Sequence, residues 1–225
     1  METMRKTAGA ACVAMAIAFM CGATGEPGTQ VHDTASMPGR TALLLRQLPT
    51  DAAAYQPETA ALVQAGIPEK YGLEEWTAVV LTNELHQHVG IYNMLGAKMG
   101  VRARELLNAP TRTVDVTAET GAAPPMSCMV DGLQAALGST LGQNLMHVPA
   151  PDAPKAAAVF SYKDKRLRLS LKQEMQKRVA ELIGLAVRDC GNLTPAYFER
   201  IEELSYAVWA EADRHGIFVE EWIAG

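Results

Sequence analysis

The chain has 225 residues, a formal net charge of −5 at pH 7 and a hydrophobic content of 48%. This acidic balance disfavours nucleic-acid binding, which needs a basic surface to meet the phosphates. The length excludes a disulfide-stapled miniprotein and is sufficient for one domain with a substantial hydrophobic core.

The first 25 residues are predicted to be a cleaved export signal. Arg5 and Lys6 form a basic start, residues 8–20 are apolar, and small residues at 23–25 fit a cleavage site. The apolar run is too short for a membrane-spanning helix, which needs about 20 residues. We therefore expect a periplasmic or secreted protein that does not span a membrane. Cys21 leaves a lipoprotein as the alternative, although the residues before it depart from the usual lipoprotein signal.

The remainder is predicted to be a leader followed by one domain. Residues 26–39 are rich in Gly, Pro, Thr and Ser and have no apolar period, which is typical of a flexible segment. Residues 40–225 show no internal repeat and no second linker. We predict that they form a single domain.

The first half of this domain is predicted to be helical. Four helices are expected, at residues 41–48, 57–65, 74–85 and 89–107. The last of them has the composition of a buried helix, with Gly96 and Gly100 four residues apart. Small residues at that spacing let another backbone approach closely.

Strand patterns follow in the middle of the chain. Four strands are expected, at residues 111–120, 145–148, 156–162 and 166–171. In the first of them, apolar Val114 and Val116 alternate with polar Thr113 and Asp115, which is typical of a half-buried strand. A helix at 128–137 is expected between the first two strands, with Ser127 as its N-cap and Gly138 as its end.

The last third is predicted to contain two long amphipathic helices, at residues 171–187 and 195–213. Strands in the middle, with helices on both sides and no strict alternation, indicate an α+β fold. We expect a mixed or antiparallel central sheet flanked by helices, with the two long helices at the C-terminus.

The most unusual short string contains His86 and His88 between two predicted helices. On a regular helix these positions point about 200° apart, so both rings meet one ion only where the backbone is irregular, as at a junction between helices. Imidazole is a suitable ligand for Zn, Cu, Ni or Fe. Such a pair is also found in purely structural roles, so the string alone leaves both interpretations open.

A second candidate site lies at the start of the helix predicted at 128–137. The positive end of the helix dipole is expected to lower the pKa of the Cys128 thiol and to favour the thiolate that binds metals. Asp131, one turn later, is placed to accept a ring N–H from a ligating histidine. The alternatives are that Cys128 is a small buried side chain or forms a disulfide with Cys190, and that Asp131 only complements the dipole.

Taken together, the two segments resemble the FmdE family, the E-type polypeptides of formylmethanofuran dehydrogenase. Residues 86–100 are similar to its opening motif, His-Gly-His-Leu, then Cys or Gly, then Pro, and later Gly-x-Arg-Met-Gly. Residues 124–142 resemble its second motif, with Cys, Asp-Gly, Gln and Gly-x-Thr-x-Gly, and 162–169 resemble the strand pair that follows. The similarity covers a motif core of roughly 76–171, and residues 172–225 form a helical extension.

The chain also departs from the family pattern. Gln87 stands where Gly is usual, Gly90 where methanogen-type sequences have Cys, and Ile91 where Pro is expected. The paired CxxC tail of some members is absent. Formylmethanofuran chemistry is not predicted here, because it is cytoplasmic and needs a separate tungsten or molybdenum pterin protein, whereas this chain has an export signal.

The resemblance implies a metal site and a dimer. His86, His88 and Cys128 are the implied ligands of Zn or another divalent transition metal, in a set of three that leaves one position open. A homodimer is also implied, with the helix of Gly96 and Gly100 or the C-terminal helices at its interface. The residues expected to contact a small ligand are Tyr92, Asn93 and Gln134.

Three functions remain open at this point. The first is an exported metal-binding protein that handles the ion or uses it to bind a small ligand. The second is a metal-dependent hydrolase or lyase, with Glu84 or Asp131 as general base. The third is a structural protein without metal, held by a disulfide between Cys128 and Cys190.

Overall fold

The computed structural model describes residues 48–224, and this part of the chain has the predicted α+β fold. The predicted export signal, the leader and nearly all of the helix expected at 41–48 lie outside the described residues. The helices are α1 (Pro57–Gln64), α2 (Ile67–Tyr71), α3 (Leu73–His86), α4 (Ile91–Leu107), α5 (Met129–Leu137), α6 (Gln173–Cys190) and α7 (Pro195–Glu211). The strands are β1 (Asp115–Ala118), β2 (Met146–His147), β3 (Ala157–Tyr162), β4 (Lys165–Leu171) and β5 (Phe218–Trp222).

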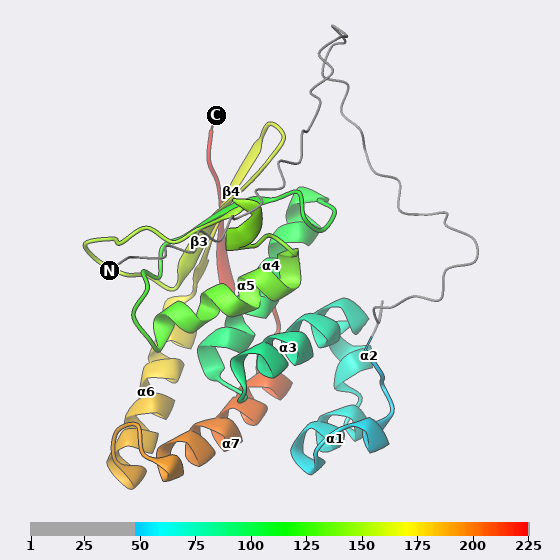
Figure 1. Ribbon diagram of the computed structural model, residues 1–225, viewed down its shortest axis with the longest axis vertical. Helices are drawn as coiled ribbons and strands as arrows, with labels where there is room; N and C mark the ends of the chain where they lie inside the picture. Colours follow the sequence, from blue (N-terminus) through cyan, green and yellow to red (C-terminus); the bar gives the residue numbers. More distant parts are fainter. Residues whose placement is uncertain (1–47, 225) are drawn as a thin grey trace, which may run out of the picture. The chain divides into compact units, whose positions relative to one another are not determined.

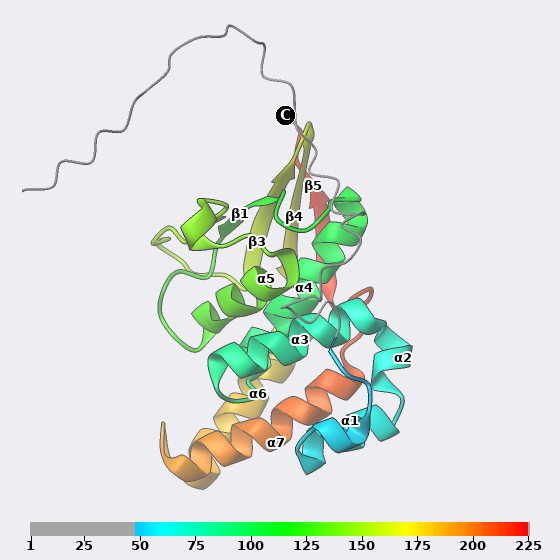
Figure 2. The same cartoon turned by 45° about the vertical axis from the view of Figure 1, so that its right-hand side comes forward.

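The strands form one mixed sheet in the order β2-β1-β3-β4-β5. Only β1 and β2 run parallel, and the other neighbours are antiparallel. The sequence predicted β1 to β4, but it did not predict β5, which pairs Phe218 with Leu171 at one edge of the sheet (Figure 2). Only Phe218 is buried in that strand, so its sequence lacks the alternation that marks a half-buried strand.

The helices pack next to this sheet. Figure 1 shows α3, α4 and α5 together beside the strands, and α6 and α7 as a helical hairpin away from the β3–β4 turn. No helix between residues 48 and 224 combines the length and apolarity that crossing a bilayer requires.

The centre of the helical layer is the contact between α4 and α5. A Cβ added at Gly96 would overlap the backbone of Met129, and one at Gly132 would overlap the carbonyl oxygen of Asn93. A Cβ at Gly100 would come within 2.7 Å of that of Ala136. The close approach predicted for α4 is therefore confirmed. Its partner is α5 of the same chain, so this face of α4 is not available for the dimer interface suggested by the sequence.

The start of α5 differs from the prediction. Ser127 was expected to be the N-cap, whereas a 3₁₀ turn over Met126–Cys128 leads into the helix and Cys128 is the N-cap, without a side-chain capping bond. Gly138 ends the helix as predicted, with φ 64°. The turn places the Cys128 side chain at the junction between loop and helix.

Replacing Gly132 by Ala is expected to lower the free energy of unfolding by about 3 kcal/mol or more, because the new methyl group has to displace the backbone of α4. Urea unfolding followed by circular dichroism measures the loss. Gly184→Ala in α6 is the control, since its Cβ would meet nothing closer than Arg188 Nη1 at 3.6 Å. That change is expected to stabilise by about 0.5–1 kcal/mol. Similar effects of the two substitutions would contradict the close-approach interpretation.

Candidate functional site

The His86–His88 string lies at an irregular junction, as predicted. Helix α3 ends at His86, and Gln87 follows in the left-handed region with φ 64°. Gly90 is the N-cap of α4, and its N–H donates to Asn93 Oδ1 over 3.1 Å. Asn93 in turn donates from Nδ2 to the His88 carbonyl over 3.3 Å. The buried Asn93 amide therefore holds the junction, and the positive φ at residue 87 explains why Gly is usual there in similar sequences.

The two histidine rings lie together at this junction. Their centroids are 4.5 Å apart, with an interplanar angle of 43°. His86 Nδ1 is 2.8 Å from Asp131 Oδ2, and the carboxylate acts as the acceptor, which leaves Nε2 of a neutral ring with its lone pair. Burial, assisted by the charge of His86, lowers the pKa of His88. His88 is therefore a neutral imidazole near neutral pH.

Cys128 is half-buried near the same group. The prediction of a lowered thiol pKa is wrong, because burial raises the pKa of Cys128 and the negative charge of Asp131 raises it further. Its own backbone N–H acts in the opposite direction but is outweighed. Both Cys128 and Cys190 are free thiols in this structure. The disulfide considered from the sequence is therefore not formed.

A cavity of about 560 Å³ brings these residues to one wall. His86, His88 and Cys128 line it on one side, together with Tyr92 and Asn93. The opposite, mostly apolar wall comes from the α6–α7 hairpin and consists of Ile183, Asn192, Leu193, Tyr197, Phe198 and Ile201. Two motifs that are about forty residues apart in sequence thus share one mainly apolar hollow.

The apolar wall was not predicted from the sequence. Phe198 makes an edge contact with the His88 ring, with centroids 5.7 Å apart. Leu193 and Phe198 are 66% and 41% exposed. Large apolar side chains at the tip of a helical hairpin were the available signal, since they have no role in the core.

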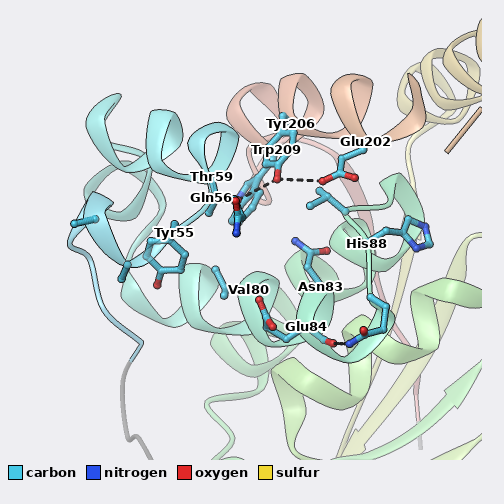
Figure 3. A pocket seen from close by; sticks show the side chains of 14 residues that line it. Tyr55, Gln56, Thr59, Val80, Asn83, Glu84, His88, Glu202, Tyr206 and Trp209 are labelled. Carbon is cyan, nitrogen blue, oxygen red and sulfur yellow. Dashed lines mark hydrogen bonds between the residues drawn. The ribbon is translucent and has the colours of Figure 1, made fainter. Parts of the chain in front are cut away.

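Other candidate residues lie elsewhere. Gln134 does not line this cavity, and its Oε1 accepts the N–H of Leu141 over 3.2 Å. Glu84 lines a different pocket, together with Asn83, beyond His88 (Figure 3). Asp131 is the partner of His86. The side chains of His, Cys, Asp and Glu in the described part of the chain form no group of three that would hold a metal ion as they lie.

Comparison with known families identifies this arrangement. A family model described as "FmdE, Molybdenum formylmethanofuran dehydrogenase operon" matches residues 85–210. The chain belongs to the FmdE family. The match runs from the end of α3 through most of α7, so it includes His86, His88, Cys128 and the apolar wall. The family membership predicted from the two motifs is thus confirmed.

A solved structure is also similar to this FmdE-family chain. It is an FmdE-like protein of the tungsten formylmethanofuran dehydrogenase type from Syntrophus aciditrophicus, with 16% sequence identity and a TM-score of 0.40. The similarity covers 67% of this chain and 72% of that chain. No curated protein matches the sequence.

Replacing Asp131 by Asn is expected to lower the pKa of the Cys128 thiol, because the substitution removes a nearby negative charge and keeps the shape of the side chain. The ultraviolet absorbance of the thiolate as a function of pH measures this shift, in a chain whose other cysteines are Ser. Asp189→Asn, on α6 beside Cys190, is the matched charge control and is expected to leave the titration unchanged. A thiol pKa that stays the same or rises in the Asp131 variant would contradict this assignment.

Proposed function

We propose that this protein is an exported member of the FmdE family that binds a divalent transition metal, zinc first among them, through His86, His88 and Cys128. The supporting observation is that these three donors come from two separate motifs and line one wall of the same cavity. The metal would serve metal handling or the binding of a small ligand.

The donor set fits a transition metal chemically. Two imidazoles and one thiol are the ligand types that zinc prefers. The hydrogen bond between Asp131 and His86 Nδ1 is the kind of outer partner that orients a ligating imidazole. Because no group of three is in place among residues 48–224, we expect metal uptake to change the rotamers of these side chains.

The position of Gly90 supports the same location. A Cβ at Gly90 would lie 3.4 Å from His88 Nε2, and methanogen-type sequences have Cys at the matching position. A thiol there would add a fourth donor beside His88. With Gly90 the set has three donors, which in zinc chemistry leaves one position for water or a ligand.

The cavity supports the ligand-binding part of the proposal. Its volume of about 560 Å³ is within the range of small-molecule sites, and the wall facing the donors is mainly apolar. A compound with one metal-binding atom and an apolar body would fit this combination. Tyr92, which lines the same cavity, has a pKa raised by burial, so it is a neutral hydrogen-bonding phenol.

The remaining parts of the proposal rest on the sequence. Export rests on the pattern of residues 1–25. The homodimer rests on the resemblance to the family, with the C-terminal helices as the remaining interface candidates. Periplasmic or secreted localisation follows from export.

The reduced, tag-free protein is expected to contain close to one equivalent of metal by plasma mass spectrometry. Cys128→Ser and His88→Ala are each expected to weaken metal binding by at least about tenfold. Cys190→Ser is the control for a change of one thiol elsewhere and is expected to retain the metal. Wild-type protein without metal under reducing conditions, or equal losses in both cysteine variants, would refute the proposed site.

Metal affinity is expected to rise with pH, by about tenfold per pH unit from neutral to mildly basic pH. The Cys128 thiol has a raised pKa and is protonated before binding, so one proton must leave as the metal enters. His88, with its lowered pKa, is already neutral in this range and adds no further proton. Competition with a chromophoric chelator measures the slope. A slope that is unchanged in the Cys128→Ser variant would contradict ligation by this thiol.

A further inference from the structure

A second pocket, of about 540 Å³, lies between α1, α3 and α7. His88 is the one residue that lines both this pocket and the metal cavity, among the residues given by the structure. Figure 3 shows the pocket with Asn83 extending into it from α3, Glu84 on the same helix, and Glu202 and Tyr206 on the facing helix α7. Its floor and rim therefore come from segments of the chain that the proposed metal site does not use.

The charge of this pocket is negative. Glu84 and Glu202 are in its lining, and no Lys or Arg lines it within the described residues. Glu202 also accepts a hydrogen bond of 3.4 Å from the Tyr206 hydroxyl, which lies 3.1 Å from Thr59 Oγ1. Burial raises the pKa of Tyr206, and the charges of Glu202 and Glu58 contribute to this increase. Such a field attracts cations and repels anions.

The pocket also contains an unsatisfied hydrogen-bond acceptor. Asn83 Oδ1 is buried and has no hydrogen-bond partner among residues 48–224. Buried polar atoms are paired in most folded proteins, because a buried carbonyl without a donor loses the hydrogen bond that it had with water. Figure 3 shows the Asn83 amide between Val80 and Tyr206, inside the pocket. An N–H donor from a ligand would satisfy this oxygen.

Aromatic rings complete the site. Tyr55 and Trp209 line the pocket together with Tyr206, and aromatic faces attract cations. Carboxylates, an unpaired amide oxygen and aromatic rings are together the groups that recognise a protonated amine. A quaternary ammonium ion has the charge but no N–H for Asn83, and a neutral alcohol has a donor but no charge.

We propose that this pocket binds a small primary or secondary amine in its protonated form, with Asn83 Oδ1 and the Glu84 and Glu202 carboxylates as acceptors. This site is separate from the proposed metal site. It requires neither Cys128 nor a bound metal, so the two proposals stand or fall independently.

Isothermal titration calorimetry on the metal-free full chain near neutral pH tests the proposal. The probes are putrescine and butylamine, with tetramethylammonium and butanol as matched controls that lack the N–H donor or the charge. The two amines are expected to bind at least about tenfold more tightly than either control, since a hydrogen bond between charged groups is worth a factor of this size. Cys128→Ser is expected to bind the amines like the wild type.

Variants locate the binding site. Glu202→Gln and Asn83→Leu are each expected to weaken amine binding by at least about tenfold. Glu203→Gln is the matched control, because it makes the same change at the next position of α7, where Glu203 pairs with Arg200 instead. It is expected to change amine affinity less than twofold. Asn83→Asp keeps an acceptor in place and is expected to retain or strengthen binding, which separates loss of the acceptor from damage to the fold.

Three outcomes would overturn the proposal. One is that the wild type does not bind amines at millimolar concentrations. Another is that tetramethylammonium binds as tightly as the amines, which would indicate only general attraction to an acidic surface. The third is that Glu203→Gln weakens binding as much as Glu202→Gln, which would place the amine outside this pocket.

Discussion

The backbone contact between α4 and α5 is the constraint on which the rest of the site depends. At Gly96 and Gly132 each helix presents a residue without a side chain to the other, so the two backbones meet directly. This contact fixes the first turn of α5 relative to the first turn of α4. As a result Asp131 lies within hydrogen-bonding distance of His86, although the two are 45 residues apart in sequence. A larger residue at either glycine would separate the two motifs.

A buried ion pair holds the other side of α4. Lys98 is fully buried and its ammonium pairs with Glu75 of α3, which also accepts from Arg214 over 2.9 Å. The Lys98 ammonium lies 4.1 Å from the centroid of the Tyr71 ring. Removing one member of such a network would leave a buried charge without a partner. The network joins α3, α4 and the segment after α7, and so keeps α7 in place opposite the α3–α4 junction, where both cavities form.

Sequence patterns predicted the features that depend on local order. The helix with Gly96 and Gly100 was recognised because its composition is almost entirely apolar, and the irregular junction followed from two histidines two positions apart. Features that depend on distant neighbours were missed. Strand β5 has one buried residue and forms because β4 offers a free edge. The thiol of Cys128 was expected to be acidic from the helix dipole alone, whereas burial and Asp131 act on it more strongly. The second pocket could not be predicted, because its walls come from three helices whose packing no local pattern encodes.

The charge states around the first cavity are consistent with a site that waits for a cation. Without metal, His88 is neutral because its pKa is lowered, and Cys128 is neutral because its pKa is raised. Only Asp131 carries a charge there, and its partner His86 lies beside it. A divalent ion with a Cys128 thiolate leaves one positive charge, which the Asp131 carboxylate balances. The same carboxylate that opposes ionisation of the empty thiol would thus neutralise the filled site, so the raised thiol pKa argues for, and not against, a role in metal binding.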